Sequence, residues 1–330
     1  MTIMKSNILK PFCALALVAG LYACQNGDIE FPDYEEGTTV YFAYQYPVRT
    51  IVLGDDEYDT SLDKAHKCQI KATFGGSYNG SNGTVQVAVD NSLVDNLTFA
   101  DGSPVKAMPT NYYTLSTTNL AFNGTMNGTT EVQLSDAFFA DPEAVKATYV
   151  IPLIMTGQSG FGRILSGQLL EGFSGSRTDA DVWDVQPKDY VLYCVKFQNK
   201  YSGWWLTNGT TSTANIEKAN AVEIKSLSLN TCSYTVSYHE GDQIYNATLL
   251  LTFNGDNCAI SSLTEGVTAT GNGSWGDDSE KKAWGNKDRD GMELNYTVDF
   301  GNGHSWSTHE KMVWQRSGVT INEFTPVYNK

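Results

Sequence analysis

Short runs of alternating apolar and polar residues, separated by turn-forming dipeptides, are the strongest constraint on how this chain of 330 residues can fold. A period of two places successive side chains on opposite faces of a strand, so one face can be buried while the other meets water. Asparagine or aspartate followed by glycine favours a tight hairpin turn, because these residues tolerate positive φ. The pattern predicts an all-β protein. In the first half, such turns are expected at Asn79-Gly80, Asn82-Gly83, Asp101-Gly102, Asn123-Gly124 and Asn127-Gly128.

Residues 38–156 are predicted to form an immunoglobulin-like β-sandwich. About seven short strands with regularly spaced turns are typical of that architecture. The one clear helical start is Asp141-Pro142-Glu143, where an N-cap residue precedes a proline at the first helical position. The space before the next strand allows only about one or two turns. The expected strands span residues 38–46, 68–74, 85–89, 112–116, 120–122, 131–134 and 149–155.

Glycine, serine and aspartate replace the strand pattern in residues 157–187, which predicts a packed linker between two domains. Residues 188–330 return to clean alternation, for example with Met292, Leu294 and Tyr296 on one face. Eight or more antiparallel strands with short connections favour a closed, lipocalin-like barrel, and a second β-sandwich is the alternative. These strands are expected at residues 190–197, 222–229, 232–238, 245–253, 258–262, 292–300, 308–316 and 319–324.

The cysteines are too sparse for a disulfide framework. Cys232 shares its predicted strand face with Tyr234 and Val236, and Cys258 is in phase with Ile260. Both thiols are therefore predicted to point inward. The pattern favours free buried thiols, which behave as small apolar side chains, over a bridge between Cys232 and Cys258.

The chain is acidic, with 22 lysines and arginines against 37 acidic residues and a formal net charge of −15. Such a surface repels phosphate backbones and anionic lipids, so neither nucleic acid nor direct electrostatic binding to a membrane is expected. No apolar run after residue 24 approaches the about 20 residues that a membrane-spanning helix needs. Attachment to a membrane would therefore have to come from a lipid anchor alone.

The N-terminus has the order of features found in an export signal. Lys5 and Lys10 precede an apolar run at residues 11–21, which is too short to cross a bilayer of about 30 Å. The following Leu21-Tyr22-Ala23-Cys24 resembles the lipobox of bacterial lipoproteins, in which the cysteine is acylated and becomes the first residue. An ordinary secretory signal is the alternative. The lipobox predicts a signal peptide at residues 1–23 and lipidation of Cys24.

Residues 24–37 are polar and acidic and are predicted to form a lipidated stalk. Cleavage before Cys24 removes two lysines and changes the formal net charge from −15 to −17. Asp28 and Glu30, close behind Cys24, resemble the acidic tether that exports lipoproteins of the Bacteroidetes to the outer face of the outer membrane. The expected location is therefore the outer membrane, facing the cell exterior.

Two pairs of segments extend this resemblance to the domains. Residues 40–50 (VYFAYQYPVRT) and 136–142 (DAFFADP) resemble the immunoglobulin-like N-terminal domain of a Bacteroidetes surface lipoprotein family, a domain also found before family-18 glycoside hydrolases. Residues 183–185 with 188–194 (WDV and KDYVLYC), together with 284–290 (WGNKDRD), resemble the C-terminal β domain of its two-domain members. The resemblance implies a lipoprotein of a polysaccharide-utilisation system, with an outer-membrane transporter and its lipoprotein lid as partners. It implies no particular binding residues.

All seven tryptophans fall in the second half of the chain. Flat aromatic rings present apolar faces to sugar C–H groups, so exposed tryptophans are typical of carbohydrate-binding surfaces. The alternative is that the rings fill the barrel core, where large aromatic side chains are usually found. Adjacent residues on a strand point to opposite faces, and aromatic residues in loops are better exposed. The candidates for glycan binding are Trp204, Trp205, Trp275, Trp284 and Trp306.

Other motifs are weaker. Asn286, Asp288 and Asp290, followed by glycine, match the first half of a calcium loop, but position 12 is Thr297 where an EF-hand needs glutamate. A polar hairpin turn is the preferred interpretation, and no metal is expected. Residues 271–276 (GNGSWG) satisfy the letters of a dinucleotide fingerprint without a helix to follow, which predicts a glycine-rich turn.

No catalytic constellation is visible in the sequence. The histidines lack metal-ligand spacing, and no Gly-x-Ser-x-Gly elbow occurs. The chain is therefore expected to be a cell-surface glycan-binding lipoprotein with no enzymatic activity and no cofactor, which captures oligo- or polysaccharide for the transporter. The alternative is an adhesin or assembly subunit that binds protein through sheet edges or loops. A glycosidase, ranked last, would require two carboxylates about 5 to 10 Å apart in one cleft.

Overall fold

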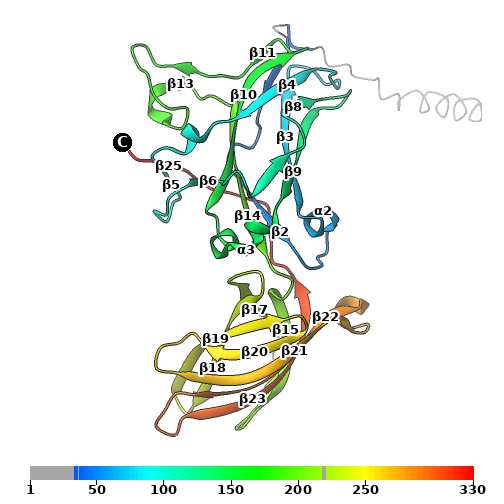
Figure 1. The fold of residues 1–330 in the computed structure, drawn as a ribbon, viewed down its shortest axis with the longest axis vertical. Coiled ribbons are helices and arrows are strands. Elements are labelled where there is room, and N and C mark those ends of the chain that lie inside the picture. Colours follow the sequence, from blue (N-terminus) through cyan, green and yellow to red (C-terminus); the bar gives the residue numbers. More distant parts are fainter. Residues whose placement is uncertain (1–32, 36, 218–220) are drawn as a thin grey trace, which may run out of the picture.

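The structure, a computed structural model, describes residues 33–35, 37–217 and 221–330. The predicted signal peptide, Cys24 and most of the predicted stalk lie outside the described residues. Within the described part, none of the helices combines the length and the apolarity needed to cross a bilayer. Two β domains lie end to end, with the N-terminal domain at the top of Figure 1 and the C-terminal barrel at the bottom.

The N-terminal domain is a β-sandwich, as predicted. Its first sheet runs, among the described residues, in the order β11 (Arg163–Ile164), β1 (Thr39–Tyr41), β3 (Lys67–Gly75), β9 (Asn127–Leu134) and β7 (Tyr113–Leu115). The second sheet runs in the order β24 (Asn322–Glu323), β2 (Pro47–Val52), β14 (Tyr190–Gln198), β10 (Tyr149–Ser159), β4 (Thr84–Val89) and β8 (Asn119–Ala121), with β6 (Lys106–Ala107) beside β10.

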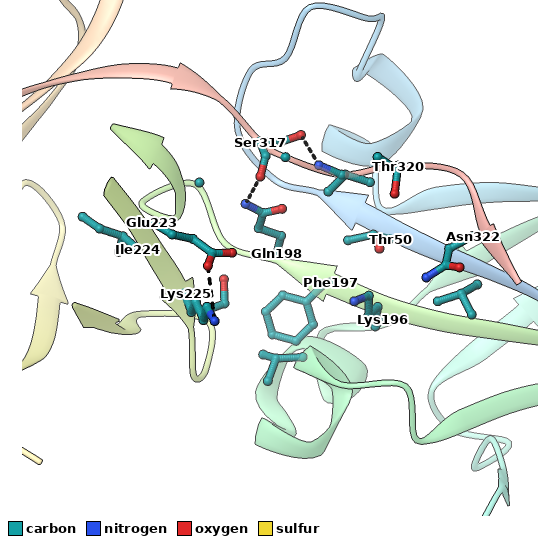
Figure 2. Close-up of a pocket in the computed structure, with 16 residues that line it drawn as sticks. Thr50, Lys196, Phe197, Gln198, Glu223, Ile224, Lys225, Ser317, Thr320 and Asn322 are labelled. Carbon is teal, nitrogen blue, oxygen red and sulfur yellow. Dashed lines mark hydrogen bonds and ion pairs between the residues drawn. The ribbon is translucent and has the colours of Figure 1, made fainter. Parts of the chain in front are cut away.

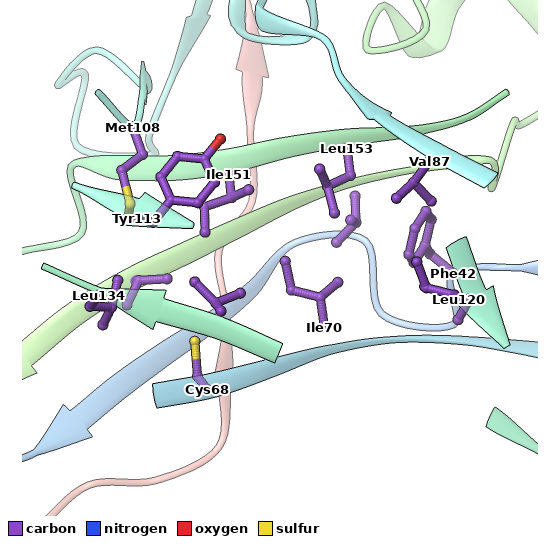
Figure 3. Close-up of a cluster of buried hydrophobic side chains, with 14 of the residues drawn as sticks. Phe42, Cys68, Ile70, Val87, Met108, Tyr113, Leu120, Leu134, Ile151 and Leu153 are labelled. Atoms are coloured by element: carbon purple, nitrogen blue, oxygen red, sulfur yellow. The ribbon is translucent and has the colours of Figure 1, made fainter. Parts of the chain in front are cut away.

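Alternate residues of both sheets meet in the core of the sandwich. Ile70 and Val132 come from the first sheet and Ile151 and Leu153 from the second, and all four are buried. Figure 3 shows the two sheets, with Ile70 of the first sheet pointing toward Ile151 and Leu153 of the second. Burial of a side chain of this size stabilises a fold by about 1.5 to 3 kcal/mol. Strands β3 and β9 alternate between buried and more exposed residues, whereas the first five residues of β10 are all buried.

In the described part of the chain, helical structure is confined to short segments. The predicted start at Asp141-Pro142-Glu143 is confirmed as a single 3-10 turn, in which an Asp141 Oδ1 atom accepts a hydrogen bond of 2.9 Å from the backbone N–H of Glu143. The described helices are α2 (Ser61–Lys64), α3 (Asp136–Ala140) and the 3-10 segments η1 (Asn91–Val94), η2 (Pro142–Val145), η3 (Ala180–Val182) and η4 (Trp284–Asn286).

Strand β14 corrects the expected domain boundary. Its residues were predicted to open the barrel, but it pairs with β10 on one side and in parallel with β2 on the other. Val191 and Val195 face the sandwich core, while Leu192 and Cys194 on the opposite face join a second buried cluster. A strand that is buried on both faces has a continuous apolar sequence without alternation. Such a sequence does not indicate which of the two domains the strand joins. The predicted linker likewise contains the end of β10 and β11, and a small sheet of β12 (Gln168–Leu169) and β13 (Trp183–Val185).

The C-terminal domain is a closed antiparallel barrel, as preferred over a second sandwich. Pairing of β15 with β23 closes the described strands into a ring, and β16 (Asn215–Glu217) adds a short hairpin to β15. Cys232 and Cys258 are buried in it as free thiols, as predicted. The eight described barrel strands are β15 (Gly203–Thr211), β17 (Val222–Ser226), β18 (Thr231–Glu240), β19 (Gln243–Asn254), β20 (Asn257–Ser262), β21 (Thr268–Glu280), β22 (Arg289–Asp299) and β23 (Ser305–Arg316).

The glycine-rich segment at residues 271–276 is strand β21 and not a turn, which corrects the prediction. Gly271 and Gly273 pair with Tyr296 and Leu294 of β22. A Cβ atom on either glycine would come within 2.6 Å of those two neighbours, so only glycine permits this close approach of the strands. Glycine here serves strand contact, which sequence alone does not distinguish from turn formation.

After the barrel the chain returns to the sandwich (Figure 1). Strand β24 pairs with β2, and β25 (Val327–Tyr328) pairs with β5 (Leu97–Thr98). Between them, the ring of Phe324 packs at 5.6 Å from Tyr46 and 5.0 Å from Phe99, measured between ring centroids. We call residues 317–328 the returning segment. It joins the end of the second domain to the first.

We predict that Phe324→Ala lowers the free energy of unfolding by about 2 kcal/mol, less than the loss of a fully buried ring because Phe324 is half-buried. Chemical denaturation followed by circular dichroism measures the change. Ile321→Ala is the matched control in the same segment, because its side chain is fully exposed and the expected change is within about 0.5 kcal/mol. Equal effects of the two substitutions would contradict the role given to Phe324.

Candidate functional site

A cleft of about 690 Å³ lies in the sandwich domain beside the returning segment. Its floor is formed by β2, β3 and β14, and residues 319–323 of the returning segment form one wall. The volume is within the roughly 300 to 1,000 Å³ typical of ligand sites. The cleft therefore combines residues from both ends of the chain.

Two exposed tyrosines line this cleft. Tyr44 is 68% exposed and lies in the connection between β1 and β2, and Tyr58 is 42% exposed and lies in the loop before α2. Burial, followed by the charges of Asp56 and Asp63, raises the pKa of the Tyr58 hydroxyl, which stays protonated at neutral pH. Each ring thus offers an apolar face together with a hydroxyl that can donate and accept hydrogen bonds.

An ion pair holds the loop that carries Tyr58. The Arg49 guanidinium on β2 pairs with the Asp63 carboxylate of α2, whose other oxygen accepts a 3.0 Å hydrogen bond from the backbone N–H of Val52. Asp63 is completely buried, whereas Arg49 is partly exposed and also lines the cleft. The pair therefore connects α2 to β2 and fixes one side of the cleft.

Polar side chains occupy the remaining wall. Gln69 and Lys71 extend from β3, and Asn322 and Glu323 come from β24. Amide, ammonium and carboxylate groups together can donate to and accept from hydroxyl groups. The arrangement of flat aromatic rings beside mixed polar groups can bind a polyhydroxylated molecule, and nothing in it constitutes a nucleophile paired with a base.

A second hollow of about 330 Å³ lies between the two domains (Figure 2). It adjoins the cleft, since Thr50, Thr320 and Asn322 line both. Lys196 and Gln198 of β14 and Glu223 and Lys225 of β17 supply much of its polar lining. The Gln198 amide donates a 3.1 Å hydrogen bond to the backbone carbonyl of Ser317, which ties the start of the returning segment to the sandwich.

Three of the five candidate tryptophans are buried in the barrel. Trp205, Trp275 and Trp306 belong to its core cluster, so their faces are not available for stacking on a sugar. Trp204 is half-buried, with the Arg316 guanidinium 5.4 Å from its ring centroid. Trp284 in η4 is 46% exposed but lies away from the cleft and the hollow. For the three buried rings the core alternative is correct, because the closed barrel needs large side chains to fill it.

Tyr44 and Tyr58 were not among the sequence candidates. Tyr44 belongs to an aromatic run that predicts a single strand at residues 38–46, whereas β1 ends at Tyr41 and the chain bends after it. Tyr58 interrupts an acidic loop, and an aromatic residue in such a loop is the signal that could have found it. The sequence around either tyrosine gives no sign that β24, from the opposite end of the chain, forms a wall of the same cleft.

The calcium candidates do not converge. Asp288 accepts hydrogen bonds from the Lys281 ammonium and the backbone N–H of Lys282, while Asp290 is buried beside Asp55 and Asp277. Asn286 ends the exposed η4 turn. The preferred interpretation of a polar turn fits Asn286 and Asp288.

Asp290 belongs instead to a carboxylate cluster between the domains. One oxygen each from Asp55, Asp277 and Asp290 lies within 4.8 Å of the others, in a hollow also lined by Lys64 and Lys200. Burial, with the charges of Asp277 and Asp55 adding to it, raises the pKa of Asp290 to about 6, against the opposing hydrogen bond from the backbone N–H of Asp278. Lys64 and Lys200 place positive charge beside these three carboxylates.

This raised pKa predicts a pH dependence of stability. In the unfolded chain an aspartate titrates near pKa 3.9, so between about pH 4 and pH 6 the folded state binds more protons and stability falls as the pH rises. Asp290→Asn, which can still accept the hydrogen bond from Asp278, should remove that decline and raise the melting temperature at pH 7. Calorimetry at about pH 4.5 and about pH 7 measures it. The exposed Asp288→Asn is the control, and an unchanged pH profile in Asp290→Asn would contradict the assignment.

Family models match both domains separately. A model named "Domain of unknown function (DUF5627)" covers residues 196–318, and a model described only as an N-terminal domain covers residues 34–162. The DUF5627 model begins within the last residues of β14 and contains all eight described barrel strands. A search of curated proteins finds no match.

Among solved structures, a Bacteroides ovatus protein of unknown function is 33% identical, with a TM-score of 0.80 over 90% of this chain and 100% of that chain. This chain therefore belongs to the same two-domain family as that protein.

Two other structures from Bacteroides ovatus are similar at a lower level. One is a multidomain protein including DUF1735, 10% identical with a TM-score of 0.39, aligned over 84% of this chain and 93% of that chain. The other, from strain ATCC 8483, is named as a candidate carbohydrate binding protein and is 15% identical with a TM-score of 0.27, over 78% and 80% of the two chains. At these scores neither structure carries an argument about function.

Proposed function

We propose that this protein binds an oligo- or polysaccharide without transforming it, and that the cleft of Tyr44 and Tyr58 is the binding site. The observation that carries the proposal is the pair of exposed tyrosines beside the amide and charged groups of Gln69, Lys71 and Asn322. Sugars present apolar C–H faces and many hydroxyl groups, and this lining complements both. The proposal moves the predicted site from the barrel tryptophans to the sandwich.

We also propose that the protein works at the cell surface as a lipoprotein. The support is the lipobox sequence ending at Cys24 and the resemblance to surface lipoproteins of polysaccharide-utilisation systems. The two or three acyl chains of a bacterial lipoprotein would anchor it stably, where one chain would not. In this proposal the protein faces the exterior of the outer membrane and passes glycan to a transporter and its lipoprotein lid.

Tyr44→Ala and Tyr58→Ala should each weaken glycan binding by roughly tenfold, because stacking of one ring contributes on the order of 1 kcal/mol and the hydroxyl adds a hydrogen bond. Isothermal titration against a panel of host and plant polysaccharides measures the affinity. Tyr78→Ala is the matched control, since Tyr78 is more exposed than either tyrosine and does not line the cleft. Absence of binding across the panel would refute the proposed function.

Lipidation is tested by metabolic labelling with radioactive palmitate in a bacterial host. The wild-type chain should be labelled and Cys24→Ala should not, because acylation requires the Cys24 thiol. Cys13→Ala removes a cysteine from within the predicted signal peptide and should leave labelling unchanged. Label on Cys24→Ala, or none on the wild type, would overturn the anchor without affecting the binding site.

A further inference from the structure

The hollow between the domains carries a positive charge without a counter-charge. Lys196 on β14 is half-buried in its wall and has no ion-pair partner among the residues the structure describes. The other charged groups that line this hollow, Glu223 and Lys225, pair with each other at 3.2 Å. The lining is thus positive overall, in a chain with a net charge of −15.

The fold explains why Lys196 is at this position. Lys196 pairs in register with Thr50 of β2, and it follows Leu192 and Cys194 on the same face of β14. The earlier part of this face is apolar, and it packs in a cluster with Leu93, Leu97, Phe99 and Val105, against which Phe324 and Tyr328 of the returning segment also pack. Near the barrel the face changes to Lys196 and Gln198, which line the hollow together with residues 317–320 of the returning segment. Figure 2 shows both side chains within the hollow.

An ammonium group in such a place is suited to an anion from outside the chain. Partial burial removes some of its hydration, and a ligand carboxylate or sulfate would replace the lost water with a charge-assisted hydrogen bond. The negative charge of the remaining surface repels such an anion only weakly, because the screening length is about 8 Å at physiological ionic strength. Within the hollow, the anion therefore responds mainly to the charge of Lys196.

The position of the hollow connects this anion to the proposed ligand. Thr50, Thr320 and Asn322 line both the hollow and the cleft of Tyr44 and Tyr58. A linear molecule that occupies the cleft and continues past the returning segment would reach Lys196. The two spaces, about 690 and 330 Å³, are of a size for several joined units and not for one.

We propose that the ligand is an acidic oligosaccharide, and that Lys196 binds the anionic substituent of a sugar unit in the interdomain hollow while neighbouring units lie in the cleft. The anion is a uronate carboxylate or a sulfate ester. This inference rests on the proposed function and specifies its substrate class. Lys196 is a specificity-determining residue in this arrangement, and Glu223 and Lys225 of the barrel complete the wall opposite it.

Isothermal titration against matched pairs tests the inference. Oligosaccharides of polygalacturonate are compared with their carboxyl-reduced form, and those of dextran sulfate with dextran, so that each pair differs in the anion alone. We expect binding of at least one acidic member, tighter by at least about tenfold than its neutral partner and weakened by added salt. The pair that responds identifies the carboxylate or the sulfate.

Three variants test whether Lys196 is responsible for the preference for the acidic oligosaccharide. Lys196→Gln should remove the preference for the acidic member and its salt dependence, while the neutral member binds as before, and Lys196→Arg should keep the preference. Lys188→Gln is the matched control, because Lys188 is also half-buried without an ion pair among the described residues but lines neither space. Unchanged melting temperatures verify that each variant folds.

The outcomes separate the two proposals. Equal binding of acidic and neutral members, or binding of neutral members alone, overturns the acidic ligand and leaves glycan binding standing. An acidic preference that survives in Lys196→Gln overturns the assignment of the hollow. Failure of all these ligands and of the wider polysaccharide panel overturns glycan binding itself.

Discussion

The packing of Phe324 between Tyr46 and Phe99 is the contact on which the arrangement of the site depends. It holds the end of the chain against the apolar cluster on the outer face of the second sheet, which includes Tyr190 and Leu192. Residues 319–323 then have to cross between the barrel and this contact. That crossing forms one wall of the cleft and also lines the interdomain hollow that adjoins it.

The face of β14 that points away from the sandwich core has two different environments along its length. Leu192 and Cys194 are buried in an apolar cluster, whereas Lys196 and Gln198 line the hollow between the domains. The change from apolar to polar side chains thus follows the change from a packed cluster to a solvent-accessible hollow. The hollow lies where the sandwich, the barrel and the returning segment meet.

The tryptophans and tyrosines illustrate how far residue type predicts a role. Trp205, Trp275 and Trp306 are the stronger candidates by chemistry, yet each fills the barrel, because a closed ring of strands needs bulky side chains inside. Tyr44 and Tyr58 are exposed because they lie in connections beside a cleft and not on a packed strand face. Residue type indicates what a side chain can do, and its position in the fold decides whether a ligand can reach it.

The sequence by itself determined the all-β class, the two domains, the inward face of strands such as β22 and the free buried thiols. These features depend on periodicity and turn chemistry, which act over a few residues. Only the tertiary structure decided that β14 joins the sandwich, that Gly271 and Gly273 lie in a strand, and that the returning segment meets Tyr44 and Tyr58 at one cleft. Those outcomes depend on contacts between residues far apart in the chain, and no local pattern records which of the possible partners packs best.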